Sequence, residues 1–91
     1  MTFRLKDGVE DSTFLEADEA FRTSFLYMQD GLARATTARG RDGDWLLLMI
    51  WGREGAAEAA TAAAREDPIA QAFLDLVDRS TVERRRYVEL D

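Results

Sequence analysis

The segment Trp45-Leu46-Leu47-Leu48-Met49-Ile50-Trp51 is the most apolar stretch of the chain. It is too short for a typical helix, and it lies between the turn residues Asp42-Gly43-Asp44 and Gly52. It therefore predicts a β-strand that is buried on both faces. Because successive residues of a strand point to opposite faces, the segment divides into two sets: Trp45, Leu47, Met49 and Trp51 on one face, and Leu46, Leu48 and Ile50 on the other.

The segments on either side of this strand predict an alternation of strands and helices. Apolar periodicity, turn residues and the N-cap signal Asp67-Pro68 place the other elements at residues 2–6 (strand), 12–29 (helix), 32–39 (strand), 53–66 and 68–77 (a broken helix), and 80–90 (strand). The order β-α-β-β-α-β predicts an α+β fold in a single domain over residues 1–91. We expect a ferredoxin-like antiparallel sheet with its helices on one face and its first and third strands in the centre.

The predicted helix over residues 12–29 carries one apolar stripe. Its members recur at helical spacing, and Gly31 suits the left-handed residue that follows a helix. We expect the stripe to face the sheet: Phe14, Ala17, Phe21, Phe25 and Met28.

Helices on one face of the sheet leave the apolar third strand half covered. Full burial of one large aliphatic side chain contributes about 1.5–3 kcal/mol, so Leu46, Leu48 and Ile50 matter in a small domain. The simplest remedy is a second copy packed sheet to sheet, and we therefore expect a homodimer. The alternative is a narrow outer face that stays partly exposed in a monomer.

Composition excludes several function classes. The chain has 91 residues with no Cys and no His, which excludes a disulfide framework, a thiolate metal site and a Ser-His-Asp site. We expect no metal. The net charge of −6 argues against nucleic acid and anionic membranes as partners. Strand alternation would divide Arg84-Arg85-Arg86 between two faces, which favours local ion pairs over a phosphate site.

The first residues lack the apolar stretch of a signal peptide, and the segment 45–51 is far shorter than the ~20 residues that cross a bilayer. A cytoplasmic protein is the expectation.

Three groups of residues resemble a known family: Phe14-Leu15 with Ala17-Asp18, Gln29-Asp30-Gly31 with Arg34, and Asp42-Gly43-Asp44-Trp45 leading to Trp51 and an Ala-rich helix. Together they resemble the dimeric α/β barrel superfamily, and within it proteins related to antibiotic biosynthesis monooxygenases. The resemblance covers nearly the whole chain. It implies a sheet-to-sheet dimer and a pocket between sheet and helices for a hydrophobic, aromatic small molecule, oxidised without metal, flavin or other cofactor.

The resemblance places the family's tryptophan at Trp51. If a pocket exists, Met49, Phe21 and Phe25 would line it together with Trp51, and Asp18 at its rim is the candidate catalytic base. In the alternative, the aromatic residues are plain core and Asp18 is a solvated residue on the flank of its helix.

Two functions therefore remain open. One is a cofactor-free monooxygenase or binder of an aromatic small molecule. The other is a non-catalytic dimeric structural or accessory protein whose core is filled.

Overall fold

A computed structural model describes residues 1–87 as one antiparallel sheet with helices packed against it. The strand order is β2-β3-β1-β4, so the first and third strands are central, as predicted. The strands are β1 (Thr2–Leu5), β2 (Leu32–Arg39), β3 (Asp44–Trp51) and β4 (Val77–Glu83). This arrangement is compatible with a ferredoxin-like fold.

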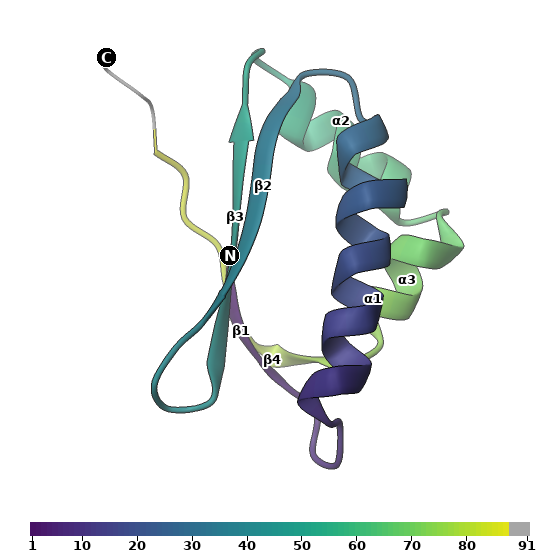
Figure 1. Ribbon diagram of the computed structural model, residues 1–91. Helices are drawn as coiled ribbons and strands as arrows, with labels where there is room; N and C mark the ends of the chain where they lie inside the picture. The colour runs from purple at the N-terminus through teal and green to yellow at the C-terminus, as the bar shows by residue number, and fades with distance from the viewer. Residues whose placement is uncertain (88–91) are drawn as a thin grey trace.

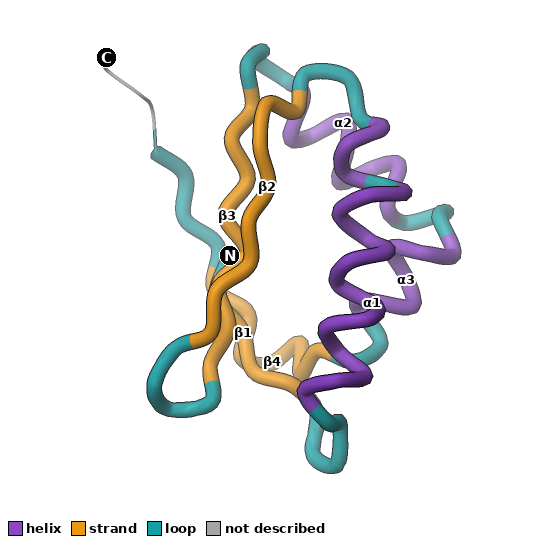
Figure 2. The backbone as a smooth tube through the Cα atoms, viewed as in Figure 1, coloured by secondary structure: helices purple, strands orange, loops and turns teal. Residues whose placement is uncertain are grey.

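All helices of the described chain lie on one side of the sheet (Figure 1). They are α1 (Asp11–Ser24), a 3-10 turn η1 (Leu26–Met28), α2 (Ala56–Ala64) and α3 (Pro68–Leu74). Figure 2 shows the strands as one layer and the helices as a second, with α1 running along the sheet. We call the sheet face toward the helices the inner face and the opposite face the outer face.

The two faces of β3 differ sharply in exposure, as the alternation of its side chains predicts. On the inner face, Trp45 and Leu47 are 4% and 1% exposed. On the outer face, Leu46 and Leu48 are 37% and 44% exposed. The helices therefore cover only one half of the apolar surface that this strand presents.

The core between the layers is built largely from aromatic rings. Phe3 of β1 packs edge-on against Phe14 of α1 and Phe73 of α3, with ring centroids 5.7 and 5.9 Å apart. Phe14 also contacts Trp45 at 4.6 Å. Phe3, Phe14 and Phe73 are each at most 2% exposed, so the first and third helices are joined to the central strands through one cluster.

The predicted helix over residues 12–29 is shorter than expected. α1 ends at Ser24, and Phe25 leaves the helical region with φ −122° and ψ −62°. The chain then tightens into η1, where the Gln29 side chain donates a hydrogen bond to the Phe25 carbonyl. The tighter turn rotates the side chains that follow it relative to the apolar stripe of α1. The prediction that Met28 faces the sheet is therefore wrong, because its side chain is 74% exposed.

The last strand also differs from its prediction over residues 80–90. β4 begins earlier, at Val77, which pairs with Leu5 and is fully buried. β4 ends at Glu83, which pairs with Thr2 at the start of β1. Beyond this pair β1 offers hardly any backbone with which β4 could continue to pair. Residues 84–87 are not part of the strand, and residues 88–90 of the predicted strand lie outside the described residues.

Gly31 links η1 to β2 in the left-handed conformation that its sequence position predicts, with φ +89°. A Cβ at this position would lie 2.8 Å from the Cβ of Ala56. The turn therefore requires glycine both for its backbone angle and for the close approach of α2.

Asp67 caps α3, as the Asp67-Pro68 pair predicts: its side chain accepts hydrogen bonds from the backbone N–H groups of Ile69 and Ala70 at 2.9 Å. Replacing Asp67 by Ala should lower the free energy of unfolding by about 1 kcal/mol, because both donors lose this acceptor. Urea unfolding measures this change. Glu66→Ala, at the exposed neighbouring position, is the control and should change stability far less. Equal effects of the two substitutions would contradict the capping role.

Candidate functional site

The two predicted ligand-binding phenylalanines lie inside a stack of rings. Phe21 of α1 and Phe25, which directly follows the helix, are nearly parallel, with centroids 5.5 Å apart. Phe21 also stacks on Phe73 at 4.4 Å and 17°. Phe21 and Phe25 are 7% and 3% exposed, so these rings contact one another and the core.

The other two predicted ligand contacts lie at the far end of β3. Met49 is half-buried and packs against the core, and Trp51 is half-buried at the last position of the strand. Neither residue lines the two clefts described below, and neither do Phe21 and Phe25. The ligand-binding role of these four residues stays a prediction.

Asp18 is fully buried on α1, and both of its carboxylate oxygens have partners. Arg22 Nε donates to Oδ2 at 3.0 Å, one helical turn away, and Thr37 Oγ1 of β2 donates to Oδ1 at 2.8 Å. No buried side-chain polar atom of the described residues lacks a hydrogen-bond partner. The hydrogen bond from Thr37 ties α1 to β2. Burying a carboxylate is costly unless its oxygens accept hydrogen bonds, and here each oxygen has a donor.

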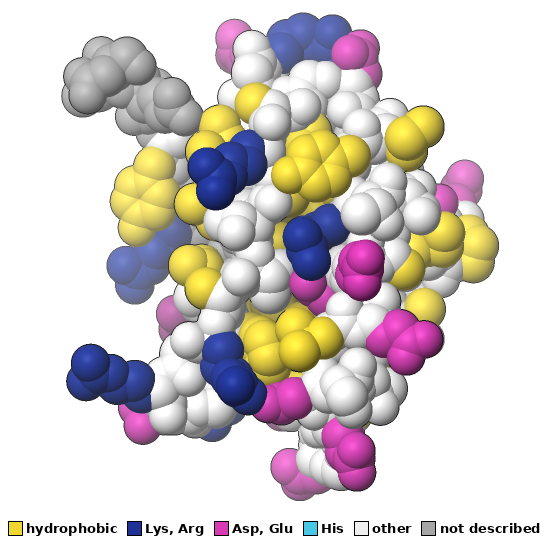
Figure 3. Space-filling view, viewed as in Figure 1, with side chains coloured by type: hydrophobic (Ala, Val, Ile, Leu, Met, Phe, Trp, Pro, Cys, Tyr) yellow, Lys and Arg dark blue, Asp and Glu magenta, His cyan; other side chains and the backbone are white. Residues whose placement is uncertain are grey.

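Charged side chains continue along the boundary between α1 and β2. In the space-filling view, acidic groups lie mainly over α1, and basic groups lie over β2 and its hairpin (Figure 3). At one end of this boundary Arg39 pairs with Asp11, and its guanidinium lies 5.6 Å from the centroid of the Trp45 ring. The helix is thus held to the edge strand at two levels, by the hydrogen bond from Thr37 to Asp18 and by the ion pair of Arg39 with Asp11.

A cleft of about 590 Å³ opens at the end of the sheet where the β1–α1 loop meets the β2–β3 hairpin. Its charged lining residues come from four parts of the chain: Arg4, Lys6, Asp7, Asp11, Arg39, Arg41 and Asp78. Sequence reasoning missed it, because its residues form no motif and meet only through the sheet order. Positive and negative side chains alternate in its lining, so the cleft favours neither a cationic nor an anionic ligand.

A smaller cleft, of about 230 Å³, lies between α2 and the chain after β4. Arg84 and Arg86 both line it and Arg85 does not, although the strand whose alternation was predicted to divide the three arginines ends at Glu83. Arg86 pairs with Glu58 of α2. The pKa of Glu58 lies below its ordinary value of 4.5, mainly because Arg86 donates a hydrogen bond to its carboxylate. Any stabilisation from this contact is therefore present above pH 4.5 and is lost as the pH falls through the lowered pKa.

The start of β1 lies close to this second cleft. Partial burial, and secondarily the charge of Arg84, lower the pKa of the Met1 amino group below its usual value of 8.0. Both causes disfavour the protonated amino group, so Met1 holds its positive charge less readily beside Arg84 than a free amino terminus would.

Within residues 1–87, no cluster of three or more His, Cys, Asp or Glu side chains is arranged to hold a metal ion. In the same part of the chain, every helix is too short or too polar to cross a bilayer. Comparisons with protein-family models, with curated proteins and with solved structures find no match to this chain.

Replacing Asp18 by Ala should lower the free energy of unfolding by about 2–3 kcal/mol, because Arg22 and Thr37 would lose their shared acceptor in a buried site. Chemical denaturation measures the change. Glu19→Ala removes a carboxylate from the next, exposed position and should cost far less. An Asp18→Ala variant as stable as the wild type would contradict the structural role and would favour the hypothesis that Asp18 is a catalytic base.

Proposed function

We propose that this chain functions as a homodimer whose outer sheet faces pack together, and that it is a non-catalytic structural or accessory module. The observation that carries the proposal is the exposure of Leu46 and Leu48 on a central strand. With Ile50 they form the strip that we call the outer apolar strip.

The neighbours of this strip suit a face-to-face contact. Across the ladder to β2, Leu46 pairs with Ala38, Leu48 with Thr36 and Ile50 with Arg34. The strip is therefore bordered by small side chains for most of its length, which lets a second sheet approach, and by a cation only at its end. A contiguous apolar surface with a polar border is typical of an association site.

The filled interior supports the non-catalytic part of the proposal. The rings of Phe21, Phe25 and Phe73 occupy the space between α1 and α3 by stacking on each other. The carboxylate of Asp18 is held by two donors, which leaves it poorly suited to accept a proton from a substrate.

The outer apolar strip gives only part of the affinity that a dimer needs. Its two leucines are each about 40% exposed, so covering them contributes about 0.6–1.2 kcal/mol each, or about 2–5 kcal/mol for the four in a dimer. A dissociation constant of 1 μM corresponds to about 8 kcal/mol. Further contacts between the copies must supply the difference.

Replacing Leu48 by Glu should weaken dimerisation at least hundredfold, because two carboxylates would be buried in the interface without partners. Light scattering after size-exclusion chromatography measures the molar mass. Leu15→Glu is a matched control, since Leu15 on α1 is 47% exposed and Leu48 is 44% exposed. A monomeric wild-type chain, or equal dimerisation of both variants, would contradict the proposal.

A second candidate function is the binding of an aromatic small molecule at Trp51, as the family resemblance implies. The half-buried state of Trp51 favours it, because a ligand could reach this ring while Trp45 is buried. A panel of quinols and phenols should then quench the fluorescence of the wild type and not of a Trp51→Phe variant. No quenching at millimolar concentration would count against this function.

A further inference from the structure

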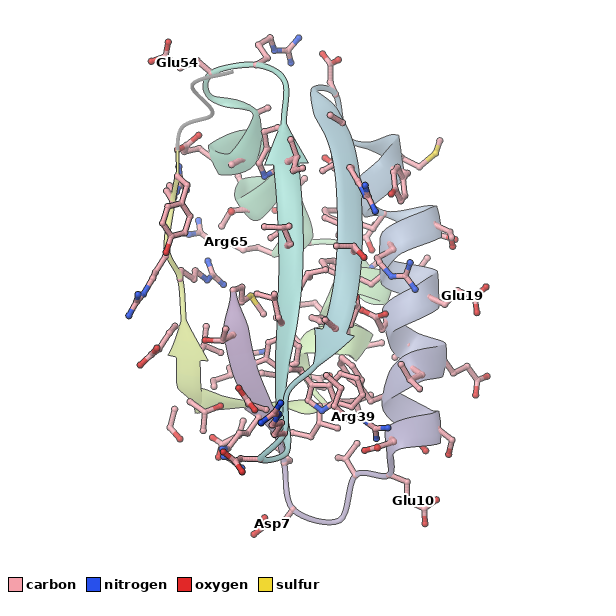
Figure 4. All side chains as sticks on the ribbon, turned by 60° about the vertical axis from the view of Figure 1, so that its left-hand side comes forward. Asp7, Glu10, Glu19, Arg39, Glu54 and Arg65 are labelled. Carbon is pink, nitrogen blue, oxygen red and sulfur yellow. The ribbon has the colours of Figure 1, made fainter. Side chains whose placement is uncertain are left out.

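β2 is the more regular of the two edge strands of the sheet. Figure 4 shows it as the last strand on the side of α1. From Arg34 to Arg39 it pairs with β3 without interruption. On the other edge, the register of β4 against β1 shifts before Arg4, whose N–H donates to the Thr81 hydroxyl. A long and regular edge is the place where a sheet most readily gains a further strand.

Alternate residues of β2 direct their backbone groups away from β3. The Gly40 N–H, directly after the strand, donates to the Asp44 carbonyl at 2.7 Å. Since the direction alternates along a strand, Thr36 and Ala38 bond to β3, whereas the N–H and C=O of Ala35 point to the edge. Within residues 1–87, no strand lies on that side of β2. Ala35 is only 5% exposed, so its two backbone groups need a partner within the protein.

The hydroxyl of Tyr27 is that partner. It accepts a hydrogen bond from the Ala35 N–H and donates one to the Ala35 carbonyl, at 3.0 Å in both contacts. A phenol hydroxyl can do both, because it is a donor and an acceptor. To reach both groups, the phenol end of Tyr27 has to lie beside the strand, where a further strand would place its own backbone. Tyr27 therefore satisfies Ala35 and also occupies the next strand position.

The position of Tyr27 allows this contact to open. η1 carries the residue, and its side chain is 47% exposed. The cluster of buried core residues does not include Tyr27. The ring can therefore turn into solvent without taking apart the aromatic core, and that movement leaves the N–H and C=O of Ala35 free.

We propose that the Tyr27 hydroxyl is a latch that keeps β2 from pairing with the β2 of a second copy. Once the latch opens, an antiparallel pair centred on Ala35 lets each freed N–H donate to the freed carbonyl of the other copy. This register places Arg34 opposite Thr36 and leaves Arg39 beyond the end of the partner strand, so like charges do not face each other directly. The inference goes beyond the outer-face dimer and does not depend on it.

Hydrogen exchange followed by NMR tests the latch at a single amide. In Tyr27→Phe at low protein concentration, the Ala35 amide should exchange about tenfold faster than in the wild type, because it loses its acceptor. The Ala38 amide faces β3 and should keep its rate. Tyr87→Phe removes the hydroxyl of a tyrosine that is 81% exposed, and it should leave the Ala35 rate unchanged.

Two results of the exchange measurement would overturn the latch. One is an unchanged Ala35 rate in Tyr27→Phe. The other is equal acceleration of the Ala35 and Ala38 amides, which would mean that the substitution loosens the whole strand.

Light scattering tests the pairing of released edges. Tyr27→Ala removes the ring as well as the hydroxyl, and its molar mass should rise about twofold above that of Met28→Ala at the same high concentration. Met28 is the next residue of η1 and is 74% exposed, which makes it a matched control. Equal masses of the two folded variants overturn the pairing. A monomeric wild type would overturn only the outer-face dimer, because this comparison does not involve the wild type.

Disulfide formation tests the register, because the natural chain has no Cys. A chain with Arg34→Cys is mixed with a chain with Thr36→Cys, both carrying Tyr27→Ala, under mild oxidation. Cross-linking should exceed that of the same two chains with Tyr27 retained by about tenfold. If Tyr27→Ala prevents folding, Tyr27→Phe takes its place in both association experiments. Equal cross-linking with and without Tyr27 overturns the proposal.

Discussion

The apolar character of β3 on both faces is the constraint on which the rest of the structure depends. A central strand needs cover on both sides, and the chain provides helices for only one. The inner side chains Trp45 and Leu47 are fully enclosed by aromatic residues of α1, α3 and β1. On the outer side, Leu46 and Leu48 keep more than a third of their surface in contact with solvent. A domain of this size has little stability to spare, so this imbalance points to association.

Polar contacts define how the covered half is assembled. Asp18 joins α1 to β2 through Thr37 and is also held by Arg22 of its own helix, and Arg39 adds a second tie to α1 through Asp11. Tyr27 performs a similar task at the other end, where its hydroxyl donates to the Ala35 carbonyl and accepts from the Ala35 N–H. These contacts set the position of α1 along the edge strand, while ring packing supplies most of the buried apolar surface.

Much of the fold could be predicted from the sequence, because the signals were local. Turn residues around Asp42-Gly43 and the cap at Asp67 placed the hairpin and the start of α3 correctly, whereas the predicted end of that helix at residue 77 was wrong, because α3 ends at Leu74. The end of α1 could not be predicted, because the contact of Tyr27 with β2 and a side-chain bond from Gln29 to the Phe25 carbonyl replace helical bonds there. The start of β4 was missed because the pairing of Val77 with Leu5 depends on the sheet order.

The candidate site was harder to predict than the fold. Asp18 was singled out as a candidate base for its place beside the apolar stripe, and the alternative of a solvated side chain is wrong, because Asp18 is fully buried. Its partner Thr37 lies in a strand whose register only the structure reveals. Phe21 and Phe25 look the same in sequence whether they line a pocket or fill a core. Phe25 stacks on Phe21, and Phe21 stacks on Phe73, which lies in a helix about fifty residues further along the chain.

The most direct test of the central claim compares methyl groups within one wild-type sample. A soluble paramagnetic agent relaxes methyl protons in proportion to their contact with solvent, and Leu15, Leu46 and Leu48 are 47%, 37% and 44% exposed in the single chain. If a second copy covers the outer face, the methyl groups of Leu46 and Leu48 should relax several-fold more slowly than those of Leu15. Equal relaxation of all three residues would contradict the account.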